Sequence, residues 1–109
     1  MESLMPSASR YRIDKFRVPA ATRAEFMERV GFIDQFLGTI DGCLSHGVYE
    51  RQVESGDWAV VTVAHWRSPE AMAAAQSLAA AEYAKSGFDP REFIKKHGVD
   101  ADIGVYREA

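Results

Sequence analysis

The sequence contains a single cysteine, Cys43, among its 109 residues. One cysteine cannot form an intramolecular disulfide, and it excludes a metal site built from several cysteines. No stretch approaches the roughly 18 consecutive apolar residues of a transmembrane helix, so we expect no contact with the membrane interior. The first ten residues have neither a basic start nor an apolar run, which argues against a signal peptide and predicts a cytoplasmic protein.

A dense patch of one charge is also missing. The 13 lysines and arginines are scattered along the chain, and the formal net charge is -3. The closest grouping, Arg91 with Lys95 and Lys96, is short and is typical of the last turn of a helix, where cations are favoured. Because no basic stripe could follow a phosphate backbone, we expect no nucleic-acid partner.

The composition is that of one ordinary globular domain, with 47% hydrophobic and 27% charged residues. Residues 1–10 contain Pro6 and three serines without hydrophobic periodicity, and this predicts a flexible N-terminal tail. The folded domain is predicted over residues 11–107. Within it, strands are predicted at Tyr11–Val18, Cys43–Gln52, Trp58–Trp66 and Ala101–Arg107.

Helices are predicted between these strands. Thr22 and Glu25 have the spacing of a capping box, and an apolar stripe at helical spacing follows it. The members of the stripe are Phe26, Val30, Ile33, Leu37 and Ile40. Ser68-Pro69-Glu70 predicts the start of a second helix that ends at Ser86-Gly87, and Asp89-Pro90 the start of a short third one. The result is a β-α-β-β-α-β order, an α+β ferredoxin-like antiparallel sheet with its helices on one face.

The third predicted strand, Trp58–Trp66, is apolar at seven of its nine positions, so both of its faces should be buried. Right-handed crossovers place the helices on one side of the sheet, and the chain has nothing left to cover the other. We therefore expect a homodimer that packs sheet against sheet, with a monomer exposing an apolar sheet as the alternative.

The turn between the second and third strands decides which side chains share a face. A turn centred on Ser55-Gly56 places Tyr49 opposite Thr62 and His46 opposite His65. This register groups Leu44, His46 and Val48 on one face with Val61, Val63 and His65, and we assign that face to the helices because it has the bulkier aliphatic side chains. Ser45, Gly47, Tyr49, Val60, Thr62, Ala64 and Trp66 are assigned to the open face. A one-residue bulge would exchange the two faces.

Two neighbouring histidines admit several interpretations. His65 and His46 could form a base and its partner, because imidazole titrates near neutral pH. They could also be metal ligands, but no third ligand stands at a recognisable spacing, so we expect no metal. The simplest interpretation is one satisfied histidine at a strand end and one solvated histidine. His97 is expected to be a residue of a helix C-terminus.

The remaining candidates surround the first and third strands. Asp14 could orient His65 or act as a base itself, or it could be a surface residue. Trp66 and Tyr83 could line a ligand pocket, although aromatic residues at such positions more often form the core or a dimer contact. Phe88, in the loop after Gly87, could cover the pocket as a lid.

Several short strings resemble the antibiotic biosynthesis monooxygenase-like family, whose members are small dimeric α/β barrels. The resemblance covers about residues 11–107. The strings are Asp14–Pro19 leading into Glu25-Phe26, Asp41–Leu44 before the second strand, Trp66–Ala71 into the second helix, and Glu82-Tyr83 before Ser86–Phe88. The Trp-x-Ser start of the second helix is the most specific of them.

The resemblance implies a ferredoxin-like protomer, a homodimer through sheet faces and a pocket between the sheet and its helices. It further implies a monooxygenase that needs no cofactor and acts on a small phenolic or quinol-type molecule. His65 and Asp14 would then be catalytic, and His46, Trp66, Tyr83 and Phe88 would bind substrate. Haem-degrading relatives need an asparagine on the first strand and a histidine on the second helix. This chain has Asp14 at the first position and no histidine from Pro69 to Lys85, which argues against haem oxygenation.

A second hypothesis is a homodimer of the same fold that binds a small molecule without catalysis, or has a structural role. It follows from the absence of a complete catalytic motif in the sequence, since a fold by itself does not establish a function.

Overall fold

The structure is a computed structural model in which residues 8–109 are described. Its elements are β1 (Arg10–Val18), the 3-10 turn η1 (Ala20–Thr22), α1 (Arg23–Gly38), β2 (Cys43–Gln52), β3 (Trp58–Trp66), α2 (Pro69–Ser86), α3 (Pro90–Lys96) and β4 (Asp100–Tyr106). The predicted tail over residues 1–10 lies mostly outside the described residues. Within residues 8–109, none of the helices combines the length and apolarity that crossing a bilayer requires.

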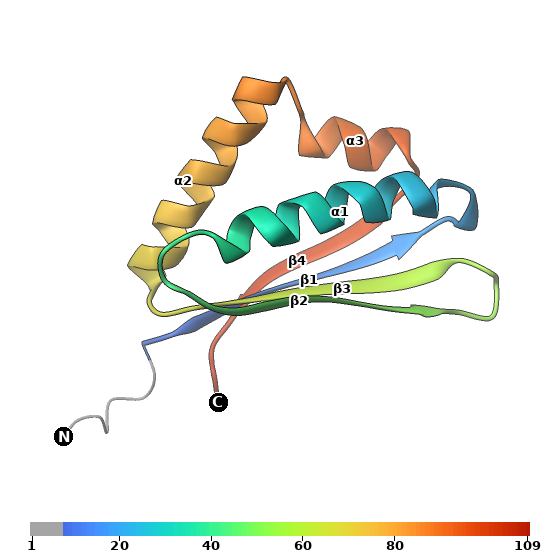
Figure 1. Ribbon diagram of the computed structural model, residues 1–109. Helices are drawn as coiled ribbons and strands as arrows, with labels where there is room; N and C mark the ends of the chain where they lie inside the picture. The colour runs from blue at the N-terminus through green and yellow to red at the C-terminus, as the bar shows by residue number, and fades with distance from the viewer. Residues whose placement is uncertain (1–7) are drawn as a thin grey trace.

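The strands form one antiparallel sheet in the order β2-β3-β1-β4, so β1 lies between β3 and β4. All three α-helices cover the same face of this sheet, with α1 lying along it and α2 leaning away from it, and no helix or strand of residues 8–109 lies on the opposite face (Figure 1). The predicted ferredoxin-like β-α-β-β-α-β fold is confirmed. We call the two sides of the sheet the covered face and the open face.

Local capping explains where the later helices begin. The Ser68 side chain accepts a hydrogen bond from Ala71 N at 3.0 Å, and Asp89 accepts from Arg91 N at 3.0 Å, so the predicted starts of α2 and α3 are confirmed. Gly87 ends α2 in the left-handed conformation, with φ 72°, which a residue without a Cβ adopts without strain.

The predicted capping box at the start of α1 is wrong. Thr22 makes no side-chain cap, because the chain enters α1 through η1 rather than from an extended residue. The Thr22 hydroxyl instead donates a hydrogen bond to the carbonyl oxygen of His97 at 2.8 Å. The start of α1 is thereby connected to the end of α3.

The predicted register between β2 and β3 is also wrong by one residue. Val53 N donates to Asp57 O at 2.9 Å, which leaves a three-residue loop closed by Gly56 at φ 94°. His46 consequently pairs with Ala64, and Ser45 pairs with His65, before a bulge shifts the pairing near Cys43. Since side chains alternate along a strand, this one-residue change exchanges the two faces of β3 relative to the prediction.

The core lies on the covered face, in two clusters. The first joins β1 and β3 to α1, and the second joins β3 to α2. Their buried members are Val18, Phe26, Val30, Val60 and Val99 in the first, and Ala64, Trp66, Met72 and Ala75 in the second. The predicted faces of β3 are therefore exchanged. Val60, Ala64 and Trp66 belong to the covered face, and Val61, Val63 and His65 belong to the open face.

Candidate active site

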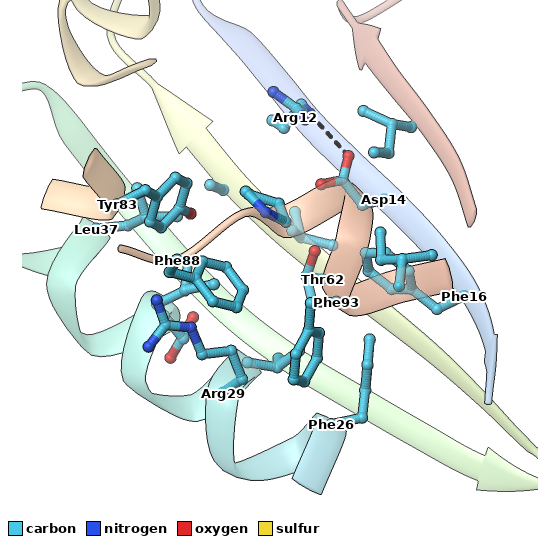
Figure 2. A pocket seen from close by; sticks show the side chains of 18 residues that line it. Arg12, Asp14, Phe16, Phe26, Arg29, Leu37, Thr62, Tyr83, Phe88 and Phe93 are labelled. Carbon is cyan, nitrogen blue, oxygen red and sulfur yellow. Dashed lines mark hydrogen bonds and ion pairs between the residues drawn. The ribbon is translucent and has the colours of Figure 1, made fainter. Parts of the chain in front are cut away.

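A cavity of about 250 Å³ lies between the sheet and helices α1 and α3 (Figure 2). Its wall is largely apolar, with Phe16, Phe26, Val30, Ile33, Leu37, Phe88, Phe93 and Ile94 among the lining residues. Its polar lining consists of Arg12, Asp14, Arg29, Asp34, Thr62 and Tyr83. Small-molecule sites commonly combine an apolar wall with a few polar groups in this way.

A second cavity of about 230 Å³ adjoins the first beneath α2. The two share six lining residues: Arg12, Asp14, Ile33, Leu37, Ala64 and Tyr83. Trp66, which is 2% exposed, lines the second cavity and not the first. The shared residues therefore stand where the two cavities meet.

Asp14 is the carboxylate of the sheet wall. It lies on β1 opposite Thr62 of β3, and Arg12, two residues earlier, shares its face. Arg12 Nε donates a hydrogen bond to Asp14 Oδ1 at 2.8 Å, and the Asp14 side chain is 15% exposed. Burial raises the pKa of Asp14 above its ordinary value, although the charge and the hydrogen bond of Arg12 act in the opposite direction.

Aromatic side chains from α2, α3 and the loop between them form the opposite wall. The Phe88 ring contacts Tyr83 edge-on at a centroid distance of 5.4 Å and Phe93 at 5.3 Å. Burial raises the pKa of Tyr83, so its hydroxyl remains protonated at neutral pH and can donate a hydrogen bond. Tyr83 and Phe88, both predicted from the sequence, thus line the cavity together with Asp14.

Arg29, on α1, adds a cation to the helix wall. Its guanidinium carbon lies 3.5 Å from the centroid of the Phe88 ring, a cation–π contact. Its Nε is buried and has no hydrogen-bond partner among the described residues. Figure 2 shows Arg29 beside Phe88, away from the Arg12–Asp14 pair on β1.

His46 lies next to the cavity rather than in its lining. Its Nδ1 is 2.8 Å from Asp34 Oδ1, and Asp34 does line the cavity. The imidazole packs closely against the backbone of Gly38, where a side chain would collide with it. The predicted covered-face position of His46 is therefore correct, and its contact with the cavity is through Asp34.

His65 lies on the other side of the sheet. The predicted position of His65 beneath the helices is wrong, because the three-residue loop shifts the register of the hairpin. Its ring stacks on Tyr11 with centroids 4.0 Å apart and planes inclined by 4°. Its Nε2 is buried without a hydrogen-bond partner among residues 8–109. The two predicted catalytic residues, Asp14 and His65, thus point to opposite faces.

Comparisons with known proteins identify the family. Residues 10–85 match the family described as antibiotic biosynthesis monooxygenase. The chain belongs to this family. No curated protein sequence matches the chain.

Solved structures share the fold at low sequence identity. A mutant of SnoaB, a cofactor-independent oxygenase from Streptomyces nogalater, is 19% identical with a TM-score of 0.65, over 93% of each chain. A candidate antibiotic biosynthesis monooxygenase from Deinococcus radiodurans is 22% identical with a TM-score of 0.68, over 92% of each chain. A dimeric ferredoxin-like protein from an uncultured marine organism is 8% identical with a TM-score of 0.69, over 93% of this chain and 95% of that one.

Membership of the antibiotic biosynthesis monooxygenase family supports a monooxygenase activity for this chain. Sequence reasoning missed three of the polar residues that line the cavity. Arg12 could have been found, because it precedes Asp14 by two residues and so shares its face. Arg29 follows Phe26 by three residues and precedes Ile33 by four, so it stands inside the apolar stripe of α1. Thr62 was assigned to the open face by the register error.

Proposed function

We propose that this protein is a cofactor-independent monooxygenase that oxidises a small phenolic or quinol-type molecule in the cavity between the sheet and α1. The observation that carries the proposal is Asp14, a carboxylate with a raised pKa in a largely apolar cavity. Such a carboxylate is a stronger base than one in water, and a base is what a phenolic substrate requires.

Deprotonation makes the substrate able to reduce oxygen. Asp14 accepts the proton of the phenol, and the resulting phenolate donates an electron to O2, which then forms a bond to a ring carbon that carries hydrogen. Loss of water from the peroxide leaves a quinone, so a phenol and O2 give a quinone and water. The substrate supplies all the electrons, and no other reductant is needed.

The other lining groups have supporting roles in this proposal. Arg12 orients the Asp14 carboxylate through its hydrogen bond, and Tyr83 donates a hydrogen bond to a substrate oxygen. Phe88 and Trp66 provide apolar contacts in the two adjoining cavities. A largely apolar wall also limits access of water to the reacting phenolate and the radical formed from it. His46 contributes through Asp34 at the cavity edge.

Oxygen uptake tests the proposal. The wild-type protein and an Asp14→Asn variant are compared in an oxygen electrode with a panel of phenols and hydroquinones. We expect the variant to lose about 100- to 10,000-fold of the rate, the contribution of a positioned base. Asp41→Asn is the matched control, because the Asp41 side chain is 92% exposed and lies outside both cavities.

Two results would contradict this function. Equal rates for the wild type and Asp14→Asn would exclude Asp14 as the base. Ligands that raise the melting temperature without oxygen uptake on any compound of the panel would favour the alternative, a binding protein of the same fold.

We also propose that the protein is a homodimer joined through the open face. Ile13 and Val63 occupy the middle of that face, between Gly47 and Gly104 of the outer strands. A Cβ at Gly47 would lie 2.7 Å from Tyr49 Oη, and one at Gly104 would lie 2.9 Å from the Tyr106 ring, so each tyrosine extends over its glycine. The resulting flat, aromatic and apolar surface suits packing against a second sheet.

A further inference from the structure

Arg29 carries a positive charge that nothing in the described part of the chain neutralises. Its side chain makes no hydrogen bond or ion pair with residues 8–109. Its guanidinium makes cation–π contacts with the rings of Phe32, Tyr83 and Phe88. A buried N–H without a partner destabilises the folded state, so such a group in a cavity calls for an explanation.

The acids of the cavity are already paired with other groups. Asp14 accepts a hydrogen bond from Arg12, and Asp34 is held by His46 Nδ1. Arg29 is therefore the one cation of the described lining that has no acidic partner. An anionic group on a ligand would supply that partner.

Phe88 fixes the direction in which Arg29 can bind a ligand. The guanidinium carbon lies 3.5 Å above the ring centroid, and Phe88 is itself held between Tyr83 and Phe93. A guanidinium that rests on an aromatic ring has one face occupied, whereas its N–H groups lie in its own plane and remain able to bind an oxyanion. The buried Nε belongs to this donor edge.

We propose that Arg29 binds a carboxylate of the substrate, so that the substrate is an aromatic acid that carries both a phenolic hydroxyl and a carboxylate. The inference rests on the proposed function in placing an aromatic molecule in this cavity. Arg29 lies on the helix wall and Asp14 on the sheet wall, so the two groups bind different parts of one ring system (Figure 2). The carboxylate at Arg29 then orients the phenol toward Asp14, and Arg29 determines specificity rather than removing the proton.

A matched pair of probes tests this without turnover. 6-Hydroxy-2-naphthoate and 2-naphthol share the ring and the hydroxyl, and only the first has a carboxylate, on the other ring, at neutral pH. Their dissociation constants are measured by calorimetry in the absence of oxygen. We expect the wild type to bind the naphthoate at least about tenfold more tightly, the selectivity of one charge-assisted hydrogen-bonding pair.

Arg29→Met should remove the preference for the naphthoate and leave the affinity for 2-naphthol within about threefold, because the neutral side chain has a similar length. Arg29→Lys should retain part of the preference, since it keeps the charge and loses the planar donor edge. Arg91→Met is the matched control; Arg91 is exposed on α3 and lines neither cavity. 2-Naphthol binding also shows that each variant retains its cavity.

Three results would overturn the inference: no preference in the wild type, a preference that survives Arg29→Met, or loss of both ligands in that variant, which would make Arg29 a structural residue. These failures are separable from failure of the proposed function. Oxygen uptake without carboxylate selectivity would refute only the role of Arg29. Carboxylate selectivity without oxygen uptake on any phenol would refute only the monooxygenase.

Discussion

On the covered face of β1, Arg12 and Asp14 line an apolar cavity beneath the helices, whereas Ile13 between them points to the opposite, open face. One strand therefore serves two purposes at alternate positions. The covered face combines a packed core with a few charged groups. The open face combines apolar and aromatic side chains, and no element of the described residues covers it. Under the two proposals above, chemistry belongs to the covered face and assembly to the open one.

The largest expected contrast comes from placing an aspartate on each face of β1. Val18 is fully buried in the core, and Val18→Asp would bury an unpaired carboxylate. Such a change costs several kcal/mol, comparable to the roughly 5–15 kcal/mol that stabilises a whole domain, so we expect an unfolded protein by circular dichroism.

Ile13→Asp, five residues earlier on the open face, should give a folded protein instead. We expect sedimentation to show a species of about 12 kDa, since the chain mass is 12.1 kDa and the charged side chains would oppose sheet-to-sheet packing. Ile13→Val is the control and should remain dimeric. An unfolded Ile13→Asp protein, or one that stays a dimer, would contradict the proposed division between the faces.

The second prediction concerns the stability of the covered face without ligand. Arg29→Met removes an unsatisfied buried N–H and loses the cation–π contacts with Phe32, Tyr83 and Phe88, of which the first two are long, at 5.3 and 6.0 Å. We expect the free protein to become more stable by about 1 kcal/mol, a rise in Tm of roughly 4 °C for a chain of this size. Differential scanning calorimetry at fixed protein concentration measures it. A lower Tm would show that Arg29 mainly supports packing around Phe88.

The third prediction follows from the raised pKa of Asp14. The folded state holds the Asp14 proton to higher pH than the unfolded chain does, so the stability of the wild type should fall as pH rises from the ordinary aspartate pKa of about 3.9 through the raised value. Asp14→Asn lacks this proton. The difference in free energy of unfolding, Asp14→Asn minus wild type, should therefore increase over that range.

Urea unfolding of both proteins from pH 3.5 to 7 measures this difference, and contributions of the other acids cancel in it. The acid limb of kcat/KM should titrate in the same range, because only ionised Asp14 accepts a proton. A difference that decreases with pH would mean that the Arg12 ion pair outweighs burial.

The sequence predicted the bounds of the strands and helices better than the register in which the strands pair. The ends of β2 and β3 were predicted to the residue, because turn residues flank both strands. Ser68 and Asp89 correctly indicated the starts of α2 and α3. The register failed since Glu54–Asp57 is compatible with loops of two or three residues, and only the conformation of Gly56 decides between them.

Hydrophobic patterning could not correct this error. β3 is apolar at both Val60 and Val61, which lie on opposite faces, so the pattern does not show which face packs into the core. The candidate site was affected more than the fold: Asp14, Tyr83 and Phe88 were found, whereas His65 was placed on the wrong face. Arg29 was not predicted for another reason: an apolar stripe is recognised from its apolar residues, and a charged residue within the stripe is not counted.

The smallest expected effect concerns His65, and it tests the same register. His65 stacks on Tyr11 on the open face, with the sheet between its ring and Asp14. His65→Gln should keep kcat within about twofold of the wild type, since no proton passes through the sheet to the cavity. Oxygen uptake at saturating substrate measures kcat, and sedimentation confirms that the variant remains dimeric. A loss of kcat comparable to that of Asp14→Asn in an intact dimer would mean that the open face takes part in the chemistry, and the division between the two faces would fail.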